Sequence, residues 1–106
     1  MIEVTDRSFP QEVVDYKGVV LVDFWAAWCM PCRMLGPIVE KVSKDYQGKM
    51  KVVKVNVDEN PGLSDQYGIM AIPTMMLFRG GQLVQRIAGL LPEAQLKKVI
   101  DQALAT

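Results

Sequence analysis

Two cysteines stand three residues apart in the Trp-Cys-Met-Pro-Cys segment at 28–32, and the chain has no other cysteine and no histidine. Paired thiols at this spacing can form a structural disulfide, supply half of a metal site, or cycle between dithiol and disulfide. A zinc site needs about four ligands, so zinc would require carboxylates or a second subunit here. A disulfide across about four residues would stabilise the fold by only ~2 kcal/mol, against ~4.7 for a loop of about 100. Redox cycling is the interpretation that the pair favours.

The cysteines fall where a buried strand passes into a helix. Residues 19–25 (VVLVDFW) form a continuous apolar run, which is typical of a strand buried on both faces. After the cysteines, apolar side chains recur at helical spacing as far as Gly48, at Leu35, Ile38, Val39, Val42 and Tyr46. We therefore expect Cys29 at the exposed N-terminal end of a helix, where free backbone N–H groups and the helix dipole favour a thiolate. Cys32 lies one turn later, within reach of it, and Pro31 suits the first helical turn.

The rest of the chain alternates between strand-like and helix-like segments. Ser8 is the expected helix cap, with Gln11 capping back and Pro10 in the first turn. Further expected elements are strands at 2–4 and 49–57, a short helix at 62–68, two strands around a Gly-Gly turn at 74–89, and a final amphipathic helix with Leu96, Val99, Ile100, Ala103 and Leu104 on one face. The order β-α-β-α-β-α-β-β-α predicts an α/β fold with parallel pairing early, a closing antiparallel hairpin, and helices on both faces. In such sheets functional groups gather at the carboxyl ends of strands, where the cysteines lie.

Composition narrows the class of protein. A chain of 106 residues is expected to form one domain, 1–106, with its own core. Twelve basic and twelve acidic side chains cancel, which argues against nucleic acid or an anionic membrane as partner. The first residues carry Glu3 and lack the pattern of a signal peptide, and the longest apolar run near them, 19–22, is too short to span a bilayer. We expect a cytoplasmic, reducing location, where structural disulfides seldom persist.

Four segments together resemble the thioredoxin family, in order and with its spacing: VDFWAAWCMPCRMLGP at 22–37, KVNVDENPGLSDQYGI at 54–69, IPTMMLF at 72–78, and Ala-Gly at 88–89. The resemblance implies the thioredoxin fold, a central mixed sheet of about five strands in the order 1-3-2-4-5. It also implies dithiol–disulfide exchange on protein substrates. No bound cofactor is expected, because the redox-active disulfide would be reduced by a separate thioredoxin reductase. The protein is expected to be a monomer.

The resemblance also implies roles for individual residues. Cys29 matches the attacking thiol and Cys32 the resolving one. Asp23 matches a buried acid beneath the dithiol, expected to accept the proton of Cys32, and Lys54 matches the neighbour that modulates it. Pro73, preceded by Ile72, matches a cis-proline that faces the active site, while Trp28, Ile72 and Gly89 match the rim that binds the substrate chain.

Each of these residues also has a simpler interpretation. Trp28 could belong to the core, and Pro73 alone could be an ordinary loop proline. Asp23 could lie where the strand reaches solvent, although four apolar residues before it and Phe24-Trp25 after it favour burial. A buried carboxyl has a raised pKa and can exchange a proton near neutral pH. Lys54 alone would be interpreted as a solvated residue on an alternating strand.

The sequence departs from the family pattern at Met30, where the family has glycine, and at Met70, where it has a polar or basic residue. Both leave the reacting groups in place. Met30, with Pro31, is expected to affect the redox potential, and both methionines are expected to offer flexible apolar contacts to substrates. A binding or chaperone-like module whose thiols are secondary stays an alternative, as does an oxidase or isomerase of the same fold.

Overall fold

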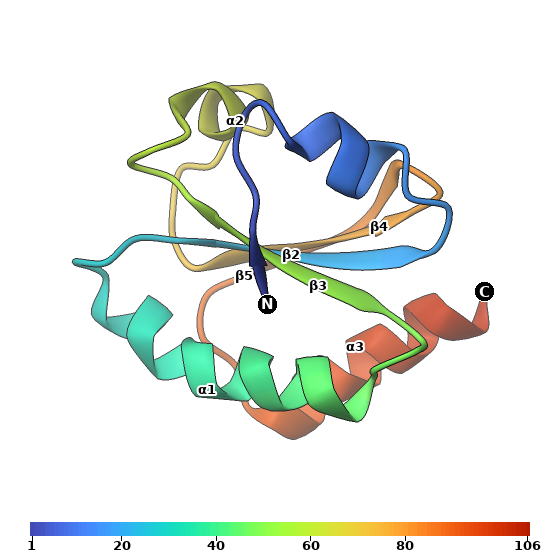
Figure 1. Ribbon diagram of the computed structural model, residues 1–106. Helices are drawn as coiled ribbons and strands as arrows, with labels where there is room; N and C mark the ends of the chain where they lie inside the picture. The colour runs from blue at the N-terminus through green and yellow to red at the C-terminus, as the bar shows by residue number, and fades with distance from the viewer.

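Figure 1 shows the protein as a computed structural model that describes residues 1–106. The elements are β1 (Ile2–Glu3), η1 (Pro10–Val14), β2 (Val19–Trp25), α1 (Met30–Asp45), β3 (Lys51–Asn56), α2 (Pro61–Gln66), β4 (Thr74–Arg79), β5 (Gln82–Ala88) and α3 (Glu93–Ala105). The strands form one sheet in the order β1-β3-β2-β4-β5. β1, β3 and β2 are parallel, and β4 is antiparallel to both β2 and β5. The predicted fold class and strand order are confirmed.

Helices cover the sheet on both faces. In Figure 1, α1 and α3 lie below the sheet, and α2 and η1 lie above it. Each face carries its own core, because alternate strand residues point to opposite sides. The lower core packs Leu35, Val39 and Val42 of α1 and Leu96 and Ile100 of α3 against the sheet. The upper core is built from valines of β2 and β3 together with Phe9, Phe24, Leu63, Met76 and Phe78.

Strand β2 lies in the middle of the sheet and passes directly into the site. Its first six residues are buried, which confirms the burial on both faces that its continuous apolar run predicted. The one ionisable side chain in the strand, Asp23, is 1% exposed. After Trp25 the chain turns at the left edge of Figure 1 and begins α1 there. The cysteines therefore lie at the carboxyl end of a central strand, as predicted.

The first helical segment begins differently from the prediction, which placed a cap at Ser8 and a partner at Gln11. The cap is Thr5: its Oγ1 accepts the Ser8 backbone N–H at 3.2 Å, and the Ser8 Oγ accepts the Thr5 N–H at 3.0 Å. These two bonds are the reciprocal pattern of a capping box, displaced by three residues toward the N-terminus. The backbone N–H of Phe9 already donates to the carbonyl of Thr5, and the following turn is wide enough to be classed as a π-helix over Pro10–Val14.

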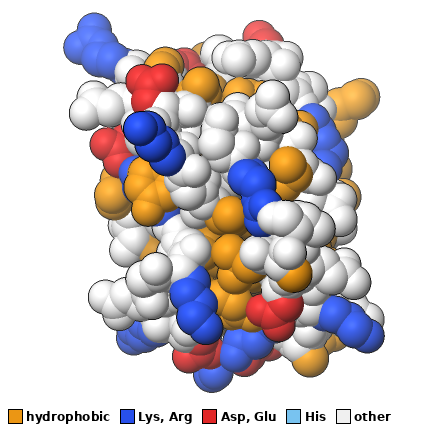
Figure 2. Space-filling model, turned by 90° about the vertical axis from the view of Figure 1, so that its right-hand side faces the viewer, with side chains coloured by type: hydrophobic (Ala, Val, Ile, Leu, Met, Phe, Trp, Pro, Cys, Tyr) orange, Lys and Arg blue, Asp and Glu red, His pale blue; other side chains and the backbone are white.

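An ion network on the surface ties α1 to α3. Lys41 and Asp45 of α1 pair with Glu93 and Lys97 of α3 at distances between 2.6 and 3.1 Å. Exposed pairs of this kind contribute little each, so the apolar contact of the two helices fixes α1 and the network adds orientation. Figure 2 shows another part of the surface, the side of the molecule away from the start of α1, where basic and acidic side chains lie interspersed around a narrow hydrophobic strip. No helix is both long enough and apolar enough to cross a membrane.

Candidate active site

Cys29 and Cys32 are joined by a disulfide whose Cα atoms lie 5.3 Å apart. Cys29 is the N-cap residue of α1, and its Sγ accepts the backbone N–H of Cys32 at 3.2 Å. Pro31 stands in the first helical turn, where its missing N–H leaves no bond unmade. The sulfur of Cys29 therefore faces the positive end of the helix, as the sequence predicted. A thiolate there is favoured by the helix dipole and by a backbone donor.

The prediction that Cys29 is exposed is wrong for the disulfide form. Cys29 is 4% exposed and Cys32 is 5% exposed, so solvent access does not distinguish them. Both pack with Ala26, and Trp25 and Ile72 lie against this small cluster. Burial in the disulfide form therefore does not separate the two cysteines, whereas the helix terminus and the N–H bond act on Cys29.

Asp23 is a buried carboxyl on the sheet face that α1 covers. Its Oδ1 has no hydrogen-bond partner, and burial raises the pKa of this carboxyl from 3.8 to about 6. Lys54 acts in the opposite direction and lowers that pKa, while Glu3 raises it. The interpretation of Asp23 as a solvent-exposed strand end is wrong. A carboxyl of this kind can accept and release a proton near neutral pH.

Lys54 lies beside Asp23 in the register of β3 with β2. Its side chain is partly buried rather than fully solvated, and its Nζ lies 4.4 Å from the centre of the Trp25 ring. A cation over an aromatic face is held by the ring quadrupole. Lys54 thus stays near Asp23 without forming an ion pair with it, so the carboxyl keeps its raised pKa.

The segment Ile72-Pro73 faces the disulfide. Its peptide bond is cis, as the resemblance implied, and the Ile72 carbonyl oxygen lies 3.8 Å from the Cys29 Sγ. The Pro73 carbonyl accepts the backbone N–H of Gly89 at 2.8 Å. Gly89 has φ +87°, a conformation that side chains rarely adopt, so this turn at the end of β5 requires glycine. The bond brings Gly89 to the same edge as the disulfide.

Trp28 projects from the loop before Cys29 and is 71% exposed. Its indole Nε1 donates to the Asp58 Oδ2 at 2.8 Å, and this bond fixes the ring in spite of its exposure. Asp58 is held in turn by Asn56, whose Oδ1 accepts the Asp58 backbone N–H at 2.9 Å. Asp58 was not predicted from the sequence. The only local signal is the spacing Asn56-x-Asp58, which is typical of a turn in which an Asn side chain bonds the backbone two residues on.

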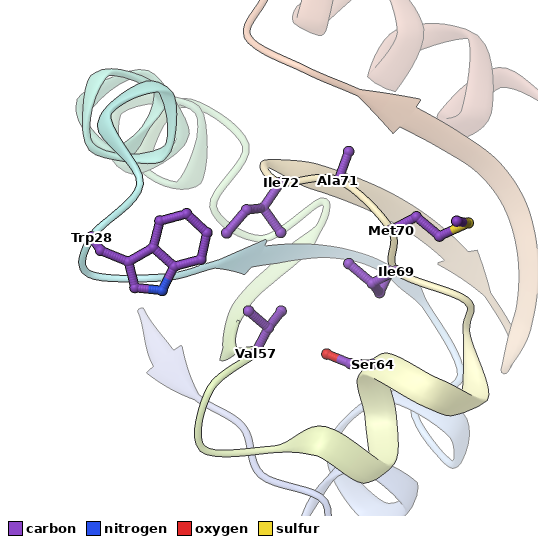
Figure 3. Close-up of a pocket in the computed structure, with 7 residues that line it drawn as sticks. All are labelled: Trp28, Val57, Ser64, Ile69, Met70, Ala71 and Ile72. Carbon is purple, nitrogen blue, oxygen red and sulfur yellow. The ribbon is translucent and has the colours of Figure 1, made fainter.

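A shallow apolar cavity of about 220 Å³ lies beside the disulfide. Figure 3 shows Trp28 on one side of it, Ile72 and Ala71 on another, and Ile69, Val57 and Ser64 opposite, with Met70 at the outer edge. Met70 is 97% exposed and Met30 is 61% exposed, so both methionines are free to contact a partner. Met34 of α1 is also largely exposed, and it was not among the residues predicted for the site.

Comparison with known proteins supports the same chemistry. The family model described as Thioredoxin matches residues 1–102. The chain is 52% identical over 102 residues to Thioredoxin 1 of Nostoc sp., covering 96% of this chain and 95% of that protein. It is 50% identical over 100 residues to Thioredoxin of Chlorobaculum thiosulfatiphilum, covering 94% and 93%, and 44% identical over 103 residues to Thioredoxin of Pyropia yezoensis, covering 97% and 96%.

Proposed function

The chain belongs to the thioredoxin family, and on that premise we propose how its own residues divide the work of thiol–disulfide exchange. Like its family, it is a protein-disulfide reductase that works through a redox-active cysteine pair, with protein disulfides as substrates and a reductase to restore the dithiol. The finer assignment of roles rests on one observation above all: the Cys29 sulfur caps α1 and accepts a backbone N–H.

In the first step of the proposed reaction, the Cys29 thiolate attacks one sulfur of a substrate disulfide. A bond forms between Cys29 and that sulfur, and the other substrate sulfur leaves as a thiolate. The Cys32 thiol then gives its proton to the carboxylate of Asp23, and the resulting Cys32 thiolate attacks the Cys29 sulfur. The second substrate thiolate leaves, and the Cys29–Cys32 disulfide forms. Two electrons have passed from the dithiol to the substrate.

Proton transfer to Asp23 fits its surroundings. With a pKa of about 6, the carboxyl is mostly ionised at neutral pH and can take a proton, yet it is basic enough to make the transfer effective. Lys54 modulates this balance by favouring the ionised form. Asp23 then returns its proton to solvent or to a departing substrate thiolate.

Substrates are proposed to bind over the cis-proline side of the disulfide. The backbone of Ile72 and Gly89 offers the surface on which an extended substrate segment can lie. An apolar substrate side chain beside the cystine can enter the cavity between Trp28 and Ile72, and Met30 and Met70 extend the contact on either side. Flexible thioethers adapt to side chains of different shape, which suits a reductase with many partners.

We further propose that residues 1–106 form a single domain that acts as a monomer. The proposed compartment is the cytoplasm, since the dithiol works where thiols are kept reduced. This assignment is tested by determining which cell fraction contains the protein.

The experiment that tests the roles is trapping. Cys32→Ser, incubated with oxidised insulin, is expected to accumulate a mixed disulfide through Cys29, because the second attack is lost. Cys29→Ser is expected to form none and to lose insulin reduction with dithiothreitol. Trapping by Cys29→Ser but not by Cys32→Ser would reverse the roles.

A further inference from the structure

Three charged residues lie side by side across the first three strands of the sheet. Glu3 of β1 is in register with Lys54 of β3, and Lys54 is in register with Asp23 of β2. Residues in register on adjacent strands point to the same face, so the three side chains form one row. The row begins at an exposed edge, at Glu3, and ends at the buried carboxyl that the proposed mechanism uses.

No other charged group faces Asp23. On its far side the row continues with Met75 of β4 and Ile87 of β5, which are apolar. The helices that cover this face present apolar side chains to the sheet: Cys32, Leu35, Val39 and Val42 from α1, and Leu96 and Ile100 from α3. The fixed charges that reach Asp23 therefore come from one direction, first from Lys54 and beyond it from Glu3.

Lys54 forms an ion pair with neither Asp23 nor Glu3. Its ammonium lies over the Trp25 ring at 4.4 Å instead. A cation held in this way acts on both neighbours through space. The total field at Asp23 is then the sum of two contributions, one from Lys54 and one from Glu3 at the outer end of the row.

We propose that Glu3 is a positioning residue for the proton-transfer step: its carboxylate stands in line with Lys54 and Asp23 and offsets the charge that Lys54 presents to Asp23. The inference deepens the proposed function and rests on it, because Asp23 is the proposed proton acceptor. It adds to the site a residue near the beginning of the chain, on the other side of β3.

The size of the effect follows from the sheet spacing. Strands two positions apart are separated by about 10 Å, and two like charges at that distance, in a medium between water and protein surface, change a proton affinity about two- to fourfold. The direction agrees with the electrostatics of the site, in which Glu3 raises the pKa of Asp23 and Lys54 lowers it. Removing the charge of Glu3 should leave Lys54 unopposed.

The test is a pH titration of the Asp23 side-chain carboxyl, followed by carbon NMR. The protein is kept in the disulfide form, so that no thiol titrates. In Glu3→Gln the midpoint is expected to fall by about 0.3 to 0.6 pH unit, which is the two- to fourfold change, and in Glu3→Lys it should fall further. Glu40→Gln is the matched control: Glu40 is an exposed carboxylate on α1 outside the row, and its removal should leave the midpoint in place.

A midpoint in Glu3→Gln equal to that of Glu40→Gln would overturn the inference. In the reduced enzyme, the acid side of the rate–pH profile for insulin reduction should move to lower pH in Glu3→Gln by the same amount. The two ideas fail separately. The titration of Asp23 decides whether Glu3 controls that carboxyl, whereas a comparison of wild type with Asp23→Asn decides whether Asp23 accepts the proton.

Discussion

The sulfur of Cys29 caps the helix that carries Cys32, because the Cys29 Sγ accepts the Cys32 backbone N–H at 3.2 Å. The two cysteine residues are buried to a similar degree, whereas this bond and the helix terminus act on Cys29. The N–H bond and the helix terminus both favour a thiolate at Cys29, and neither acts on the Cys32 sulfur. The proposed division of labour between the two cysteines rests on this geometry of the first turn of α1.

The first prediction follows from this asymmetry. In the reduced protein Cys29 should react with iodoacetamide at least about tenfold faster than Cys32 at neutral pH, because more of it is thiolate. Mass spectrometry of peptides after brief labelling measures the two rates. The same protein unfolded in guanidinium chloride is the control and should label both cysteines at similar rates. Equal labelling in the folded protein would contradict the assignment.

The second prediction concerns the rate of exchange in Asp23→Asn. Insulin reduction should slow by about tenfold or more, since general base catalysis contributes on the order of a hundredfold or greater. The loss should be largest above pH 6, where Asp23 is ionised, and should shrink below it. Asp65→Asn, an exposed change on α2, is the control and should behave as wild type. An unchanged rate in Asp23→Asn would remove the residue from the mechanism.

The third prediction concerns stability and pH. The folded pKa of Asp23 lies above its ordinary value of 3.8, at about 6, so the folded state binds the proton more tightly than the unfolded state. The stabilising effect of this protonation is fully present below 3.8 and is lost as pH rises through 6. The difference between the two pKa values corresponds to about 3 kcal/mol of folding free energy.

Asp23→Asn should therefore be more stable than wild type at pH 7, because a buried charge is removed. The gain should be about 1 to 3 kcal/mol, below the full value where the buried amide lacks hydrogen-bond partners. The advantage should vanish near pH 3. Urea unfolding at both pH values measures it, and an advantage that is independent of pH would contradict the burial of a charged Asp23.

The fourth prediction concerns Met30. Glycine at a helical position costs up to about 1 kcal/mol, and less near a terminus, so Met30 stabilises α1 in both oxidation states. A contribution shared by both states cannot move the redox potential far, and Met30→Gly should shift it by about 30 mV or less, where 30 mV corresponds to about 1.4 kcal/mol. Relative rates among protein substrates should change more. A larger shift in the glutathione equilibrium with unaltered substrate preference would show that Met30 acts on the dithiol itself.

The fifth prediction concerns the residue that fixes Trp28. Asp58→Ala removes the acceptor of the indole N–H and frees the exposed ring. Reduction of insulin should fall about threefold, in line with a partly solvated hydrogen bond to a charged group, while reduction of a small aromatic disulfide should stay the same. Glu59→Ala, the neighbouring acid, is the matched control. Equal losses with both kinds of substrate would place the effect on the dithiol rather than on binding.

The sequence predicted the sheet well because its signals are local and strong. The apolar run of β2, the Gly-Gly turn between β4 and β5, and the helical spacing after the cysteines each point to one structure. The helix before β2 was harder. Ser8 and Thr5 are both good caps, and only the fold, which bonds the Phe9 N–H to the Thr5 carbonyl, decides between them.

The site was predicted only where its residues are close in sequence or match a family motif. Contacts between distant segments were not predicted, because nothing in the order of residues shows that Trp28 contacts Asp58 or that Glu3 is in register with Lys54. The burial of Cys29 was not predicted for the same reason. Cys29 begins a helix and is covered only because Ile72, which is distant in the sequence, packs against it.

The exposure of Trp28, Met30, Met34 and Met70 has a consequence for how such a protein can change over generations. These side chains are largely exposed and contribute little to the core, so replacements that keep the helix propensity of residue 30 should change the folding equilibrium little. Asp23 and the two cysteines are buried, so a substitution at any of them alters the packed interior of the proposed site. Surface substitutions at these four positions could therefore change the set of partners one residue at a time, without altering the proposed reaction centre.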